Sequence, residues 1–189
     1  MPFTLFHYPF GYWLSKVDRK LVLPALIVGS LIPDIEVPLL GILFTGTVPN
    51  HLFLHSLIGA LTLGLLLSVV VTRFIYPSVI EWTFKVEREK LDNACRITSW
   101  MVTSCAIGLV GHIAVDYFHH WYNPIFWPWV DPFIIVGPLV SLFAMIFSTD
   151  ILTGYVIANG LSNVTMLIVL IWIIRRNKEN RWNRLWLGS

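Results

Sequence analysis

The chain has 189 residues, of which 56% are hydrophobic and only 13% are charged, and its mean hydropathy is +0.72. A soluble domain usually carries about 25% charged residues, so this composition favours an integral membrane protein over a soluble one. The net charge of +2 is too small to suggest nucleic-acid binding, and two cysteines without a CxxC pair exclude a disulfide framework, so Cys95 and Cys105 are expected to be free thiols.

The first fifty residues predict a helical hairpin rather than a clear membrane span. The opening lacks a basic region and a small-residue cleavage site, so we expect no cleaved signal peptide. We expect a short helix over about residues 5–15, a polar tip from Lys16 to Lys20, and a second helix over about residues 21–32 that Pro33 ends. Neither arm clearly spans alone, so the hairpin is expected to dip into the membrane and pack against other helices.

Three later segments are apolar enough to cross a bilayer as helices, which takes about 20 residues. They are residues 52–72, 98–118 and 155–174. A fourth segment, 133–148, is shorter but also predicts a span. The sequence therefore predicts an all-α integral membrane protein with an N-terminal helical hairpin and about four transmembrane helices.

Two loops separate these segments. Residues 73–97 carry charges of both signs, so we expect a solvated amphipathic connector there. Residues 121–132 are rich in Trp and Pro, which predicts either an interfacial aromatic belt or an aromatic wall that faces a substrate. We expect residues 1–189 to form one transmembrane helical domain, with the site motifs in 1–120 and a loop and helices in 121–189.

The basic residues do not fix the orientation if all four segments span. Eight of them lie in the hairpin tip and in residues 73–97, and five follow the last helix. Cytoplasmic loops carry an excess of Lys and Arg. A fourth span would put these two groups of basic residues on opposite faces of the membrane.

Ionisable residues gather at the predicted helix ends on one side. His112, Asp116 and His120 follow one another at a spacing of four, so they share one helix stripe. His55 begins the preceding antiparallel span and reaches the same face. In the hairpin, the first arm starts near His7 and the second arm ends near Asp34, so these two residues are expected to lie at the same depth in the membrane. We therefore predict a polar cluster at one membrane face that contains His7, Asp34, His55, His112, Asp116 and His120.

These residue types favour a metal site, because ionisable side chains inside a membrane are costly and rarely occur without a role. Imidazole and carboxylate ligands together suit zinc and similar ions, and ligands beyond four would let two ions share a carboxylate. We expect a divalent metal, most simply zinc, with polar capping of helix ends as the alternative. Glu36 is expected behind the ligands, and His51 is equally consistent with an interfacial position. The candidates of second rank are Glu36, His51, His119 and Asp131.

Four motifs in order resemble those of a family of small membrane proteins. They are "MPFT" followed by His7, "ALIVGSLIPDIE" at 25–36, "HSLIGALTLGLLL" at 55–67 and "GHIAVDYFHH" at 111–120. That family is similar to the membrane-bound metal-dependent hydrolases and, more distantly, to zinc-dependent phospholipase C. The resemblance covers about residues 1–120 and implies a metal held by His7, Asp34, His55, His112, Asp116 and His120. Soluble phospholipases of this type have more ligands, so a full three-metal site is not implied.

The expected function is a membrane-embedded metal-dependent hydrolase that acts on a phosphoester of a lipid. Asp34 or Asp116 would serve as general base toward a metal-activated water. We expect an integral protein of the plasma membrane, with membrane lipid as environment and substrate and no nucleic acid as partner. The main alternative is a non-catalytic scaffold or partner subunit whose helix ends are tied by metal or polar caps. A haem protein or a transporter fits less well, because carboxylates are unusual beside haem and the chain shows no repeat.

Overall fold

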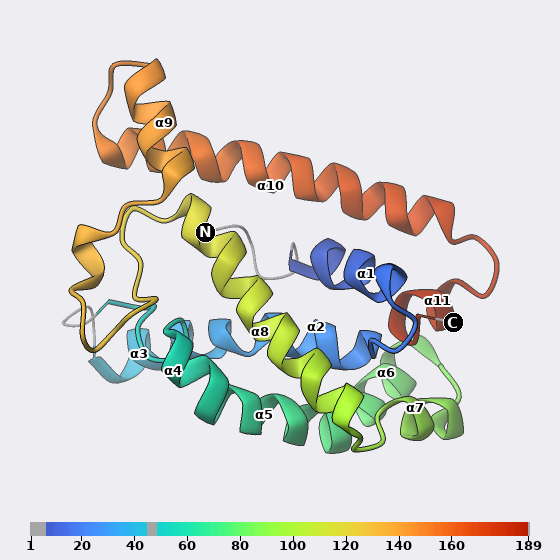
Figure 1. Cartoon of the computed structure of the whole chain (residues 1–189). Coiled ribbons are helices and arrows are strands. Elements are labelled where there is room, and N and C mark those ends of the chain that lie inside the picture. The colour runs from blue at the N-terminus through green and yellow to red at the C-terminus, as the bar shows by residue number, and fades with distance from the viewer. Residues whose placement is uncertain (1–6, 45–48, 189) are drawn as a thin grey trace.

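A computed structural model describes residues 7–44 and 49–188, and every regular element in these ranges is helical (Figure 1). Four helices in them are long and apolar enough to cross a membrane: Leu23–Phe44, Leu57–Phe84, Ser99–His119 and Ile151–Arg176. The prediction of an all-α membrane protein with about four spans is therefore confirmed. The set of spans differs from the predicted set at two places.

The N-terminal hairpin consists of α1 (Tyr8–Val17) and α2 (Leu23–Leu31), joined by a short polar turn. The first residues of the predicted helix, 5–6, lie outside the described ranges. Helix α2 is the most buried element, because every residue from its start to Ser30 is buried, mainly against α1 and the third long helix. The second arm of the hairpin thus lies at the centre of the bundle.

Helix α2 ends before Pro33, as predicted, but the chain stays helical. A 3₁₀ turn, η2 (Pro33–Ile35), leads directly into α3 (Glu36–Phe44). Proline is tolerated in the first turn of a helix, where its missing N–H has no partner to lose. The prediction that neither arm spans is therefore wrong for the second arm. Residues Leu23–Phe44 form one candidate span of 22 residues, about 33 Å long at 1.5 Å per residue.

The second long helix begins later and ends later than predicted. Ser56 caps its start, since its Oγ accepts a hydrogen bond of 3.0 Å from the N–H of Gly59. Lys85, with φ of +56°, ends it. Residues 73–84 therefore continue the span, and the prediction of a loop over 73–97 is wrong there. The successive parts of this helix are α4 (Leu57–Gly59), η3 (Ala60–Gly64), α5 (Leu65–Val70), η4 (Val71–Ile75) and α6 (Tyr76–Phe84).

Two helices follow that complete the central packing. Helix α7 (Arg88–Ala94) is a short helix within the charged segment, and α8 (Ser99–His119) is the predicted third span. Helix α8 crosses α2 so closely that a Cβ added to Gly108 would lie only 2.5 Å from the carbonyl oxygen of Leu26. Small residues allow such close helix crossings in membranes.

The segment after α8 does not cross the membrane. It contains η5 (Pro132–Ile134) and α9 (Pro138–Ile146), and nine residues of helix reach only about 14 Å. The prediction of a span over 133–148 is therefore wrong, because prolines at 132 and 138 divide the apolar run into two short helices. Helix α9 packs on the start of α10 (Ile151–Arg176), which is the predicted last span.

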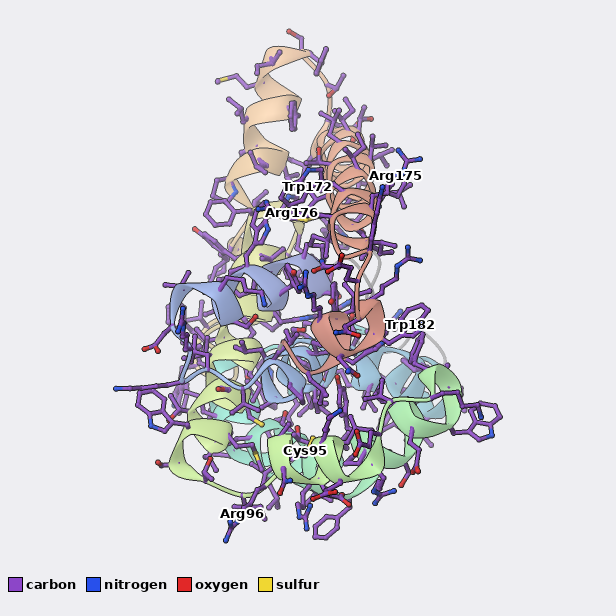
Figure 2. All side chains as sticks on the ribbon, turned by 90° about the vertical axis from the view of Figure 1, so that its right-hand side faces the viewer. Cys95, Arg96, Trp172, Arg175, Arg176 and Trp182 are labelled. Carbon is purple, nitrogen blue, oxygen red and sulfur yellow. The ribbon has the colours of Figure 1, made fainter. Side chains whose placement is uncertain are left out.

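The C-terminal helix α11 (Arg181–Trp186) returns to the first helices. The hydroxyl of Tyr8 donates to the carbonyl oxygen of Leu185, and that of Tyr76 donates to the carbonyl oxygen of Trp186, both at 2.7 Å. The end of α10 therefore lies beside the α1–α2 turn and α6, at the end of the molecule that faces the viewer in Figure 2.

All thirteen Lys and Arg residues lie in segments that meet at this end, which we call the basic end. Lys16 donates to the carbonyl oxygen of Gly188 at 2.9 Å, and Lys20 lies over the ring of Trp100. Arg73 reaches from the second long helix to Asp92 in α7, at 3.7 Å. The expected free thiols, Cys95 and Cys105, are confirmed, and both are buried. Large apolar side chains are exposed along α3, α5 and α10, as expected of helices that face lipid.

Candidate metal centre

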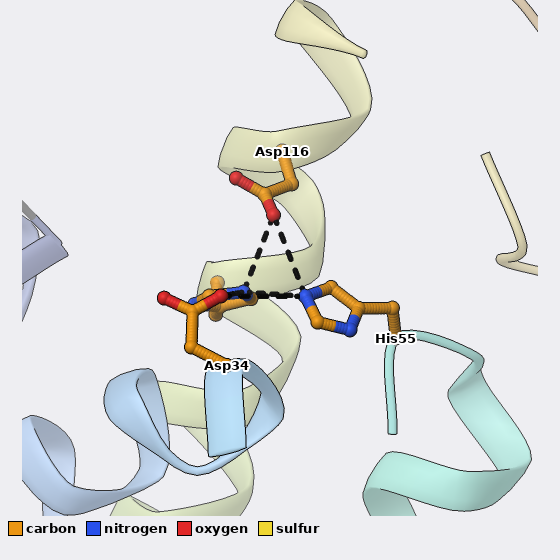
Figure 3. Close-up of side chains that lie close together, drawn as sticks. Asp34, His55 and Asp116 are labelled. Carbon is orange, nitrogen blue, oxygen red and sulfur yellow. Dashed lines mark hydrogen bonds and ion pairs between the residues drawn. The ribbon is translucent and has the colours of Figure 1, made fainter. Parts of the chain in front are cut away.

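The predicted polar cluster forms away from the basic end, where three elements meet (Figure 3). Asp34 lies in the η2 turn after α2, His55 lies just before α4, and His112 and Asp116 lie one turn apart on α8. Each of the four residues is at most 7% exposed. One ligand atom from each lies within 4.8 Å of the others, a grouping that could hold a metal ion.

The four side chains face one another across short distances. Nε2 of His112 lies 3.5 Å from Oδ1 of Asp34 and 3.3 Å from Oδ2 of Asp116. Nε2 of His55 lies 3.5 Å and 3.7 Å from the same two oxygen atoms. The two Nε2 atoms are 3.2 Å apart. The arrangement therefore points two nitrogens and two carboxylate oxygens at one place.

Hydrogen bonds at the far side of each ring fix which nitrogen faces the cluster. Nδ1–H of His112 donates to the carbonyl oxygen of Ser30 at 2.7 Å, and Nδ1–H of His55 donates to Oε1 of Glu36 at 2.7 Å. When both rings are neutral, each therefore presents an Nε2 lone pair, and two lone pairs at 3.2 Å repel unless a cation lies beside them. Histidine ligands of metals are held in this way by a carbonyl or a carboxylate.

Glu36 also fixes the backbone that carries His55. Its Oε1 accepts a hydrogen bond of 2.6 Å from the N–H of Leu52, and its Oε2 accepts one of 2.7 Å from the N–H of Leu54. These bonds hold a segment without regular structure against the end of α2. The expectation that Glu36 lies behind the ligands agrees with these contacts.

A metal ion fits the electrostatics of the cluster. The segments that build it, residues 21–72 and 97–174, contain no Lys or Arg to balance its carboxylates. In the described part of the chain, neither oxygen of Asp116 and neither ring nitrogen of His7 has a hydrogen-bond partner, although all four atoms are buried. Buried polar atoms are almost always hydrogen-bonded unless they serve another purpose. These atoms and the facing imidazoles suit a divalent cation such as zinc.

A proton on His55 takes the place of a cation when no metal is bound. Burial lowers the pKa of this imidazole, but the carboxylates of Asp34 and Glu36 outweigh burial and raise the pKa to about 9. Metal binding to an imidazole requires the neutral ring and therefore releases this proton.

His7 lies at the cluster but beside the group of four ligand atoms. Its ring stacks on that of His112 with centroids 4.1 Å apart, and its Nε2 lies 3.6 Å from Oδ1 of Asp116. The hairpin thus brings His7 and Asp34 to one level, as the sequence predicts. The motif residues 1–4 lie outside the described ranges.

A second group of possible ligands adjoins the first. It consists of His51, Asp116 and His120, whose ligand atoms also lie within 4.8 Å of one another. Burial lowers the pKa of His51 to about 2 and that of His120 to about 4, so both rings are neutral. His120 was predicted as a ligand, whereas His51 was only a candidate of second rank.

Two other candidates lie apart from the cluster. His119 faces α10, where its Nε2 contacts the hydroxyl of Ser162 while its Nδ1–H donates to the carbonyl oxygen of Val115. Asp131 caps η5 by accepting a hydrogen bond of 3.0 Å from the N–H of Phe133. Neither contributes to a ligand group within the described residues.

The Trp-rich loop closes the cluster from outside. Residues 123–125 line a cavity with His51, His55, Asp116 and His120, and this cavity has room for about one water molecule. Trp129 points outward and is 73% exposed, whereas Tyr122 lies with its hydroxyl 3.3 Å from Nδ1 of His51. The loop therefore combines an exposed aromatic rim with a wall of the site.

The fold and the cluster together define an integral membrane protein with a buried group of His and carboxylate side chains between its helices. A family profile described as YdjM inner membrane protein matches residues 5–182. The chain therefore belongs to the YdjM inner membrane protein family, which agrees with the predicted resemblance to a membrane-protein family and with an integral location in the inner membrane. No curated protein and no solved structure matches it.

Proposed function

We propose that this protein is a membrane-embedded metal-dependent hydrolase that cleaves a phosphoester bond of a lipid. The observation that supports this function is the buried group of Asp34, His55, His112 and Asp116, whose ligand atoms converge within 4.8 Å. Imidazole and carboxylate are ligand types that zinc takes, and three of these four side chains suffice for a catalytic ion that keeps its fourth position for water.

Each group of such a site would have its own role in the hydrolysis. Zinc, when bound, lowers the pKa of a water ligand to about 7 and offsets the negative charge of a phosphate. A carboxylate oxygen of Asp34 or Asp116 that is not a ligand accepts the proton of the attacking water as the bond from phosphorus to the leaving oxygen breaks. Glu36 and the carbonyl of Ser30 keep the two imidazoles oriented throughout.

A lipid substrate is supported by an apolar groove beside the cluster. The groove has a volume of about 520 Å³ and lies between α2, α3 and η4. Apolar side chains line it except for Asp34, a residue of the ligand group. A hydrocarbon chain in this groove would place a phosphate headgroup beside the metal.

The first test is the metal content of detergent-purified protein, measured by elemental mass spectrometry. We expect zinc or manganese in stoichiometric amount in the wild type and its loss in His112→Ala and Asp116→Ala. His119→Ala is the matched control, because this ring lies on the same helix and faces α10. Phospholipid and prenyl phosphate substrates are then tested with the same proteins. Folded wild type without metal would refute the proposal.

A non-catalytic scaffold is the second candidate. The narrow cavity beside the cluster, with room for about one water molecule, favours it. In that case the ion only ties the η2 turn, the segment before α4 and α8 together. Bound metal without hydrolysis of any phosphoester, together with lower thermal stability after chelation, would support this reading.

A further inference from the structure

We propose that the site holds two divalent ions, with Asp116 shared between them and His51 and His120 as the ligands of the second ion. The inference rests on the proposed metal centre and assigns it a second position. The first ion takes the group of Asp34, His55, His112 and Asp116, and the second takes the adjoining group of His51, Asp116 and His120.

The number of ligands carries this inference. A tetrahedral ion has four coordination positions, and the four side chains of the first group are already enough to fill them. His120 is then left over, although its Nε2 lies 3.6 Å from Oδ2 of Asp116. This nitrogen is buried and has no hydrogen-bond partner among the described residues. A single ion therefore leaves an imidazole that faces the shared carboxylate without a role.

The second group is as well enclosed as the first. His51 is 8% exposed, Asp116 4% and His120 4%. The rings of His51 and His120 have centroids 4.8 Å apart, and the hydroxyl of Tyr122 lies 3.3 Å from Nδ1 of His51. The hydrogen bond between this hydroxyl and Nδ1 fixes the orientation of the His51 ring, just as the bond to the Ser30 carbonyl fixes that of His112.

The two groups meet at one carboxylate and at one cavity. Asp116 has three imidazoles beside its Oδ2 and a fourth, that of His7, beside its Oδ1. Because imidazoles of both groups face Oδ2, this carboxylate can be shared by two ions, which lie about 3.5–4 Å apart in sites of this kind. Residues of both groups, His51, His55, Asp116 and His120, line the same small cavity, so a molecule bound there would contact both ions. Two ions at this spacing clamp a phosphate, which agrees with a phosphoester substrate.

The test counts ions. Purified wild type and the variants His51→Gln, His120→Gln and His119→Gln are loaded with Mn²⁺, and the metal-to-protein ratio is measured by elemental mass spectrometry. We expect two ions per chain in the wild type and in His119→Gln, and one in each of the other two variants. Electron paramagnetic resonance adds a readout that does not depend on activity, since two adjacent Mn²⁺ ions give an exchange-coupled spectrum. That spectrum should disappear in His51→Gln and His120→Gln.

Each outcome has a separate meaning. A ratio of one in the wild type, or a ratio of two that His51→Gln leaves unchanged, overturns the second ion and leaves the first in place. A ratio of zero in folded wild type overturns the metal centre itself, and the second ion with it. Gel filtration and thermal unfolding of every variant show whether a lost ion reflects a lost ligand or a lost fold.

Discussion

Glu36 shows how a single side chain supports the candidate metal centre without a predicted role as a ligand. It is 4% exposed and accepts three hydrogen bonds, two from backbone N–H groups and one from His55. A buried carboxylate is costly unless it is satisfied in this way. Its position therefore determines where His55 lies and which of the two ring nitrogens faces Asp34.

We expect Glu36→Gln to weaken metal binding by about 10- to 100-fold, the usual cost of losing a carboxylate behind a histidine ligand. The amide has only one oxygen, and its NH₂ group cannot accept a hydrogen bond, so the variant loses either the bond from Leu54 or the bonds from Leu52 and His55. Competition with a chelator of known affinity measures the change. Glu89→Gln, an exposed change in α7, is the control. Equal affinities of the two variants would contradict the assigned role of Glu36.

Sequence spacing predicted those site residues that lie on helices. His112 and Asp116 follow from the four-residue period of α8, and Asp34 follows from the end of the hairpin. His51, a candidate of second rank, joins a possible ligand group, but its direction could not be predicted because residues 50–56 form turns without a regular period. The role of the Ser30 carbonyl could not be predicted from the sequence, because every residue has a backbone carbonyl and only the helix crossing brings this one to His112.

At the scale of elements, the crossing of α2 and α8 determines the geometry of the site. Gly29 and Gly108 lie at this crossing, and a methyl group on either would overlap backbone atoms of the opposite helix. The close approach allows Ser30 in α2 to bond His112 in α8. A wider crossing would separate the two halves of the ligand group.

Gly108→Ala should therefore destabilise the protein by about 1–3 kcal/mol, the usual cost of overpacking. Gly160→Ala on α10 is the matched control, because nothing lies within 4 Å of its added methyl group. That change should be neutral or stabilise by up to about 1 kcal/mol, because glycine disfavours helices. Thermal unfolding in detergent measures both variants. A control as unstable as Gly108→Ala would refute the packing argument.

The groove between α2, α3 and η4 gives a prediction about substrate length. Val37→Trp and Val71→Trp place a large ring in this groove, away from the ligand atoms. We expect hydrolysis of a long-chain lipid phosphoester to fall at least about tenfold, since one misplaced group can cost that much. A short-chain soluble phosphoester and the metal content should be unaffected. Val156→Trp, on the exposed side of α10, is the control. Equal losses on both substrates would exclude the groove as the chain-binding site.

The spans were predicted well where an apolar run had no interruption, and poorly where proline fell inside one. Residues 98–118 and 155–174 correspond closely to α8 and α10. Pro33 was read as the end of a membrane helix, but it only starts a new turn. Pro132 and Pro138 also begin helices, η5 and α9, but extended residues separate these two short helices, so no long span forms. The difference is decided by the packing around each proline, which a single sequence does not contain.

At the scale of the whole molecule, the fold removes the conflict between the two groups of basic residues. Because residues 120–150 do not cross the membrane, α10 runs back to the basic end (Figure 1), where the segments that carry all thirteen Lys and Arg residues meet. Positive residues favour the cytoplasmic side. The ligand group begins at Asp34, about 16 Å from the basic end along α2, so the distribution of basic residues predicts that it lies toward the extracytoplasmic side.

Cysteine labelling tests this orientation. Glu89→Cys lies at the basic end, and Thr149→Cys lies between α9 and α10 at the other end, and both positions are exposed. A membrane-impermeant maleimide should label Thr149→Cys in spheroplasts and Glu89→Cys only after lysis. The wild type serves as blank, since burial shields both native thiols and raises the pKa of Cys95 to about 12. The reverse pattern would place the cluster on the cytoplasmic side.

The arrangement of Glu36 also determines the order in which the protein can mature. All three of its partners lie in residues 52–55, so this half of the site is complete soon after His55 leaves the ribosome. His112 and Asp116 enter the membrane much later, with α8. A metal ion can be fully ligated only after that point. In the proposed centre, metal capture is therefore expected late in biogenesis, after α8 has joined the other helices.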